Sequence, residues 1–169
     1  GKTQAVEIAS LDLKAPQFAD GADIDITGSY NKTPFQLNGN IGLLSKALKP
    51  NQKWPLKLEA QAVKTKVSIE GSIQDLMNVQ GIDLKIAAEG EDLAQFEKIT
   101  GEPLPVKGPF RFSGHFVSPS DKEVQVSDLL IELAGSQMQG TVKVTHAAKR
   151  PLVEAKLTSN KLDLRPLLA

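Results

Sequence analysis

The feature that most constrains this chain is an alternation of apolar and polar residues that recurs along almost its whole length. Between residues 23 and 30, for example, Ile24 and Ile26 alternate with Asp25 and Thr27. The same period returns near residues 35–41, 56–62, 67–73, 82–88, 110–116, 129–133, 138–144 and 153–157. A period of two is typical of strands that bury one face and expose the other. Turn-forming residues separate these segments, so we predict about ten strands joined mainly by antiparallel hairpins.

Helical patterns are short and few. In "EDLAQFEKITG", Asp92 suits an N-cap position, and Leu93, Phe96 and Ile99 then share one helical face. A weaker helical pattern, "GLLSKALKP", covers residues 42–50. Two short helices cannot cover so many amphipathic strands, so we expect the apolar strand faces to be shielded mainly by one another.

Three architectures bring such faces together: a two-sheet sandwich, a closed barrel, or one long sheet curled into a trough. The inward positions hold mostly medium aliphatic residues, and the whole chain has only one Trp, one Tyr and six Phe. Gly71, Gly114 and Gly140 occupy inward positions, where glycine indicates sharp curvature or close approach of a neighbouring group. We therefore predict an all-β fold built on a long, strongly curled antiparallel sheet with one or two short capping helices. A β-sandwich is the alternative.

Two stretches of the chain share one scheme, which indicates an internal repeat. Residues 67–96 and 138–168 each contain an apolar strand with a glycine, a hairpin turn, a second apolar strand and a step to Asp-Leu. We expect residues 1–169 to form a single β-repeat domain that is a piece of a longer repetitive chain. The predicted sub-repeats are approximately 11–50, 55–101 and 102–169.

The reactive and charged residues of the sequence argue against an enzymatic activity and against binding of nucleic acid. The 20 basic and 20 acidic residues cancel and are spread through the sequence, and cysteine is absent. His115 is expected on the polar face of a strand, and His146 is expected in a turn. Both should be exposed to solvent, and neither has a neighbouring acid or nucleophile in sequence. Asp20, Asp23 and Asp25 lie close together but lack the spacing of a helical calcium loop. We expect no catalytic residue, no cofactor, no metal site and no enzymatic activity.

At this point three stretches carry a resemblance: "DLAQFEKITGEPLPVKGPFRFSGHF", "VSDLLIELAGSQMQGTVKV" and "RPLVEAKLTSNKLDLRPLL". They resemble the C-terminal repeat pattern of the AsmA-like family of bacterial envelope proteins. In that pattern a short Asp-Leu helix leads to a Gly-Pro-rich joint, a strand ending in Ser-Gly, and a closing Leu-Asp-Leu. The resemblance covers roughly residues 80–169, and the first half shares only the hairpin rhythm.

The resemblance implies a periplasmic protein of Gram-negative bacteria, anchored to the inner membrane through a segment outside these 169 residues. The implied protein is similar to bridge-like transporters, whose curled sheet conveys phospholipid between the inner and outer membranes and supports envelope integrity. The implied partners are phospholipid acyl chains, neighbouring repeats and envelope proteins. An alternative is a structural or chaperone-like module in outer-membrane protein assembly that acts through β-edge pairing.

The apolar positions define the candidate site. If lipid fills the groove, its lining is predicted to be Ile24, Ile26, Leu37, Leu58, Val67, Ile69, Ile82, Leu84, Ile86, Phe110, Phe112, Phe116, Leu129, Ile131, Leu133, Val142, Val144, Val153 and Leu157. Leu93, Phe96 and Ile99 are expected to form a helix at the seam between repeats. The same alternation also fits side chains that pack against each other as a dry core, because it reports only an apolar face.

Overall fold

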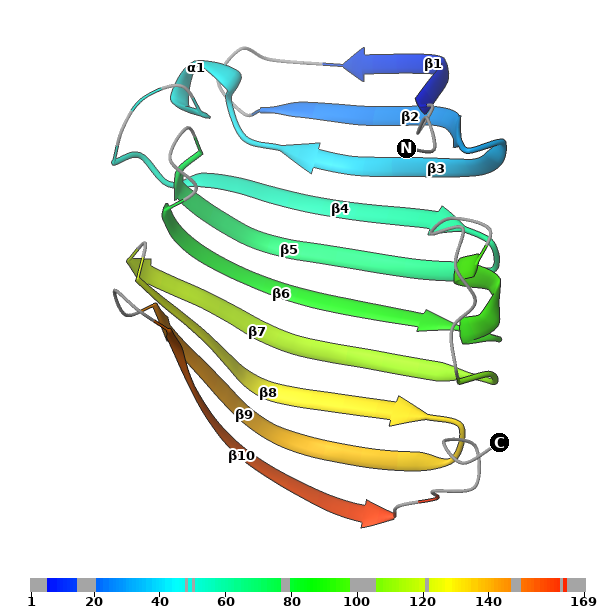
Figure 1. Cartoon of the computed structure of the whole chain (residues 1–169). Helices are drawn as coiled ribbons and strands as arrows, with labels where there is room; N and C mark the ends of the chain where they lie inside the picture. The colour runs from blue at the N-terminus through cyan, green and yellow to red at the C-terminus, as the bar shows by residue number, and fades with distance from the viewer. Residues whose placement is uncertain are drawn as a thin grey trace.

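A computed structural model describes residues 6–14, 21–47, 49, 51–76, 80–97, 106–120, 122–146, 150–161 and 163. Within these residues, ten strands form one sheet whose order follows the sequence, and every pairing is antiparallel (Figure 1). The strands are β1 (Val6–Lys14), β2 (Ala22–Tyr30), β3 (Thr33–Ile41), β4 (Trp54–Ala62), β5 (Thr65–Asp75), β6 (Gln80–Gly90), β7 (Phe110–Ser120), β8 (Glu123–Leu133), β9 (Ser136–His146) and β10 (Pro151–Lys161). The prediction of an all-β, ten-stranded antiparallel sheet is confirmed. The sandwich alternative is wrong, because one sheet contains all ten strands.

The sheet is open, with β1 and β10 at its two edges. Strands β7 to β10 bend visibly along their length in Figure 1, but the sheet does not close on itself. The strong lengthwise curl expected from the sequence therefore stays a prediction.

The tightest connections are two-residue hairpin turns with both residues at positive φ. Such pairs occur at Asn31–Lys32, Val63–Lys64 and Ala134–Gly135. Positive φ at both positions is the geometry of a type I′ turn, whose twist matches that of the two strands it joins. These turns explain why β2–β3, β4–β5 and β8–β9 pair as neighbours without a crossover.

Within the described residues, helical structure occurs in two longer connections at opposite ends of the strands (Figure 1). Helix α1 (Leu44–Ala47) lies between β3 and β4, and the 3-10 helix η1 (Leu93–Phe96) follows β6. The connection with α1 is tied to β4, because Trp54 Nε1 donates a hydrogen bond to the Gly42 carbonyl at 2.8 Å. Each of these two helical elements spans four described residues.

The best-buried part of the apolar face is a small cluster on β2, β3 and β4. Ala22, Ile41 and Leu56 are 5%, 9% and 8% exposed and form its centre. Side chains packed around this centre are less buried: Ile24, Trp54, Leu58, Ile69, Ile73 and Leu84. The core of this protein is therefore local, and most of the sheet lies outside it.

Several strand glycines permit close approach between neighbouring strands. Gly39, Gly71 and Gly140 have φ of +151°, +149° and +156°, and a Cβ at each would collide with a backbone carbonyl of the next strand. At Gly114, a Cβ would lie 2.9 Å from Cγ1 of Val126. The close approach predicted at Gly71, Gly114 and Gly140 is thus confirmed. At Gly71 and Gly140, both the positive φ and the collision of an added Cβ with the neighbouring strand require glycine.

Candidate functional site

One face of the sheet is apolar across all ten strands. Cross-strand partners lie on the same face, and the pairing runs unbroken from Ile24 through Gly39, Leu58, Ile69 and Ile86. It continues across β7, β8, β9 and β10 in the same way, with a bulge in β8 that restores the apolar side after Asp128. Every residue of the predicted lining lies on this face. The structure thus brings the predicted positions together into one surface.

This apolar face is only half buried. Most of its side chains are neither buried nor fully exposed, and no described side chain is completely enclosed. The chain exposes 11604 Å², whereas the size scaling of compact monomers gives roughly 8,100 Å² for a chain of this length. The large apolar residues that are most exposed lie on the edge strands: Ile8, Leu11, Leu152, Val153 and Leu157. A single-layer sheet of this kind leaves an apolar surface available to another molecule.

The seam residues cover one end of this face. Leu93 and Phe96 lie in η1, and the Phe96 ring contacts the Phe110 ring edge-on at a centroid distance of 5.6 Å. Val106, which precedes β7, is 7% exposed. Ile99 lies outside the described residues. Leu93 and Phe96 thus lie in the connection between β6 and β7, and their role at a seam between repeats stays a prediction.

Asp92 fastens this junction. Its Oδ1 accepts hydrogen bonds from the backbone N–H of Gly108 at 2.8 Å and of Ala94 at 3.1 Å. The Leu93 N–H donates to the Gly108 carbonyl at 2.9 Å, so the start of η1 and the approach to β7 are held side by side. Donation from Gly108 and then from Ala94 lowers the pKa of Asp92 below its ordinary value, because both bonds favour the carboxylate.

We predict that Asp92→Ala lowers the free energy of unfolding at neutral pH, and that Asp92→Asn lowers it less because the amide oxygen can still accept a hydrogen bond. A lowered folded-state pKa means that the charged form stabilises the fold above the unfolded pKa near 3.8. This stabilisation is lost as the pH falls through the folded pKa. Urea unfolding at pH 7 and in acid measures both effects. An identical gap between wild type and Asp92→Asn at the two pH values would contradict the assignment.

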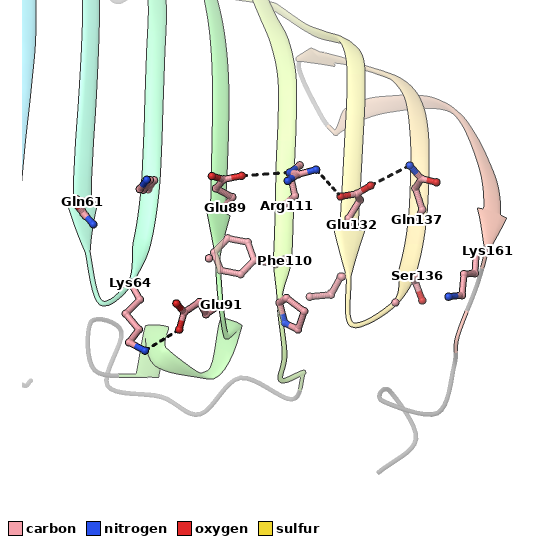
Figure 2. Close-up of a pocket in the computed structure, with 15 residues that line it drawn as sticks. Gln61, Lys64, Glu89, Glu91, Phe110, Arg111, Glu132, Ser136, Gln137 and Lys161 are labelled. Atoms are coloured by element: carbon pink, nitrogen blue, oxygen red, sulfur yellow. Dashed lines mark hydrogen bonds and ion pairs between the residues drawn. The ribbon is translucent and has the colours of Figure 1, made fainter.

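The opposite face is polar and carries cross-strand ion pairs. Figure 2 shows Arg111 between Glu89 and Glu132, with Nε 3.4 Å from Glu89 and Nη1 3.4 Å from Glu132. Gln137 extends this row by donating to Glu132 at 3.2 Å. These residues border a shallow hollow of about 800 Å³ beside Lys64, which pairs with Glu91 at 2.8 Å. Exposed pairs of this kind add little stability, but they keep this face solvated.

His115 corrects one expectation from the sequence. It lies on the polar face as predicted, but its side chain is only 30% exposed, and its Nε2 is 2.7 Å from Oδ1 of Asp83 on β6. Sequence proximity could not reveal this acid, because the two residues become neighbours only through strand pairing. His146 is exposed as predicted, but it ends strand β9 rather than lying in a turn.

Within the described residues, no set of three or more His, Cys, Asp or Glu side chains is arranged to hold a metal ion. Of the calcium-loop residues considered from the sequence, Asp23 and Asp25 lie on the polar face of β2, and Asp20 is outside the described residues. In the same part of the chain, no helix has the length and apolarity that crossing a bilayer requires.

Comparison with known proteins identifies a relative. The chain is 27% identical over 148 residues to the AsmA family protein YhjG of Escherichia coli (strain K12), which covers 83% of this chain and 22% of the relative. The chain therefore spans about a fifth of the length of that protein. No family model matches the chain, and no solved structure matches it. Together with the repeat motifs, the similarity to YhjG supports the assignment of this chain to the AsmA-like family.

Proposed function

We propose that this chain is a segment of an envelope-associated protein whose apolar sheet face holds phospholipid acyl chains and conveys them between the inner and outer membranes. The observation that carries the proposal is the continuous, half-buried apolar face across ten strands. Each methylene moved from water onto such a surface stabilises the complex by up to about 0.8 kcal/mol. The AsmA-like assignment supports a place in the periplasm, with an anchor in the inner membrane outside these residues.

The composition of the face favours sliding over tight binding. Its central row runs from Gly39 through Leu58, Ile69 and Ile86 to Gly114, so aliphatic side chains lie between two glycine positions and no charged group interrupts the row. Conveyance along such a surface needs no catalysed step, and we propose a role without enzymatic activity. In the longer protein, further curling of the sheet would narrow this face into a groove and leave lipid head groups in water.

The polar face of the sheet is unsuited to binding acyl chains. Its charges are paired across strands, as in the contacts of Lys57 with Glu70 at 3.5 Å and of Lys143 with Glu123 at 3.0 Å. Charged, well-hydrated side chains disfavour the burial of acyl chains there. The two faces thus give a lipid one side on which to bind.

We predict that the chain, purified without detergent after periplasmic expression, carries phospholipid that native mass spectrometry and lipid extraction detect. Ile69→Asp should abolish this signal, because it places an unpaired carboxylate in the middle of the apolar face. Ser68→Asp is the matched control: Ser68 is the preceding residue on β5 and is exposed on the polar face, so this variant should retain lipid.

Circular dichroism establishes whether both variants keep the β-sheet. A folded wild type that carries no phospholipid would contradict the proposed function. Equal lipid loss in folded Ile69→Asp and Ser68→Asp would instead show that the bound lipid does not occupy the apolar face.

A further inference from the structure

The connections at the two ends of the strands differ in charge. Because every pairing is antiparallel, successive connections alternate between the α1 end and the η1 end of the strands, on the left and right of Figure 1. Those at the α1 end are 15–21, 42–53, 76–79, 121–122 and 147–150, and those at the η1 end are 31–32, 63–64, 91–109 and 134–135. By sequence, the first set holds six basic and two acidic residues, whereas the second set holds four of each. Positive charge is thus concentrated at the α1 end, although the whole chain has no net charge.

Five described cations contribute to this excess, and together they form what we call the α1 rim: Lys46, Lys49, Lys53, Lys122 and Arg150. Each of them is exposed, and none takes part in an ion pair within the described residues. Glu123 and Asp75 lie at the same strand ends, but Glu123 is 3.0 Å from Lys143, and Asp75 has an interaction of its own. The cations of the α1 rim are therefore available to an anion from outside the chain.

The α1 rim does not depend on the two edge strands of the sheet. Lys46, Lys49 and Lys53 lie between β3 and β4, Lys122 precedes β8, and Arg150 precedes β10. Each of these connections joins two strands that already pair with each other, so it keeps its place whatever lies beside β1 or β10. From β4 to β10 the rim extends across six strand spacings, on the order of 30 Å.

The α1 rim borders the apolar face. Trp54 directly follows Lys53 and packs against the buried cluster, and its cross-strand partner on the apolar face is Ile73. The hydrogen bond from Trp54 Nε1 to the Gly42 carbonyl holds the connection with α1 at this margin. A lipid on the apolar face whose ester end points toward α1 would bring its phosphate to these cations, and lysine and arginine both bind phosphate oxygens.

We propose that lipids on the apolar face hold their head groups along the α1 rim, and that the rim selects phospholipids of net negative charge over zwitterionic ones. This inference rests on the proposed function and adds to it the direction of the bound lipid and the charge of its head group. A zwitterionic head group brings an ammonium ion that the rim repels, whereas an anionic head group brings only the attracted charge. The η1 end has no comparable excess, because Lys64 is 2.8 Å from Glu91 and acids equal bases in number there.

The test mixes the chain with vesicles made of equal parts of phosphatidylglycerol and phosphatidylcholine with the same acyl chains. After flotation removes the vesicles, mass spectrometry measures the lipids that remain with the protein. Wild type should carry at least about five times more phosphatidylglycerol than phosphatidylcholine, since each exposed charge pair contributes a factor of roughly 1.4 or more. Lys46→Gln/Lys49→Gln/Lys53→Gln should lower this ratio at least about threefold and leave the total amount of bound lipid within about twofold.

Lys32→Gln/Lys107→Gln/Lys161→Gln is the matched control. These three cations are exposed and lie at the η1 end of the strands. Both triple variants lower the net charge of the chain by three, so a difference between them reports the position of the charges. The control should keep the wild-type ratio, and circular dichroism should show the same β-sheet in both variants.

Three results would overturn the inference and leave the proposed function intact. The first is bound lipid without enrichment of phosphatidylglycerol in wild type, and the second is an equal fall of the ratio in both triple variants. The third is a wild type that floats with phosphatidylglycerol vesicles and carries away only phosphatidylcholine, because the rim would then bind a membrane surface. A chain that carries no lipid at all would instead contradict the proposed function, and this inference with it.

The single tryptophan tests the direction of the lipid without any change of charge. Trp54 lies on the apolar face next to the α1 rim. Bromine quenches tryptophan fluorescence only at short range, so phosphatidylglycerol brominated near its ester end should quench Trp54 more than phosphatidylglycerol brominated near its methyl end. Stronger quenching from the methyl end would place the head groups at the η1 end and overturn the inference.

Discussion

Replacing Gly71 with alanine is expected to lower the free energy of unfolding by about 3 kcal/mol or more. Gly71 lies in the middle of β5 at φ +149°, and a Cβ there would collide with the carbonyl oxygen of Asp83 on β6. The substitution therefore combines a backbone conformation that L-residues avoid with a backbone collision that no side-chain rotation relieves. Because β5 joins β4 to β6, the resulting shift would disturb both ladders.

Urea unfolding followed by circular dichroism measures this effect. Gly135→Ala is the matched control, because Gly135 also has positive φ, +88°, but no heavy atom lies within 4 Å of its added Cβ. The control should cost about 1 kcal/mol, the penalty for an L-residue in the left-handed region. Equal losses in the two variants would show that the collision at Asp83 contributes nothing.

Replacing Leu56 with alanine is expected to lower the free energy of unfolding by about 3 kcal/mol. Leu56 is 8% exposed and forms the buried cluster with Ala22 and Ile41. Removal of its side chain leaves a cavity in the only part of the apolar face where the described side chains form a buried core. A local core of this kind has few other contacts that could compensate.

The same unfolding measurement tests this prediction against Leu11→Ala. Leu11 is 60% exposed on β1, so its truncation should change the free energy of unfolding by less than about 0.5 kcal/mol. An equal loss of the free energy of unfolding in both variants would contradict this prediction. It would show that the apolar face as a whole stabilises the sheet and that the cluster around Leu56 contributes no more than the rest.

Some features of the candidate site could be predicted from local sequence patterns, and others depend on the tertiary structure. The alternation of Ile24, Ile26 and their counterparts was enough to predict the strands and to sort the apolar side chains onto one face. Asp92 was recognisable as an N-cap because its bond to the Ala94 N–H lies two residues away. Its second bond, to Gly108, spans 16 residues and could not be seen in the local pattern.

What the sequence by itself determined is the strand content, the side on which each residue lies and the hairpin order, because these depend on a period of two and on short turns. Only the tertiary structure decided that all ten strands form one open sheet with a half-buried apolar face. It also decided which charges meet across strands, as His115 and Asp83 do. The physical reason is that alternation specifies an apolar face but not what covers it, and ion pairs between strands depend on register.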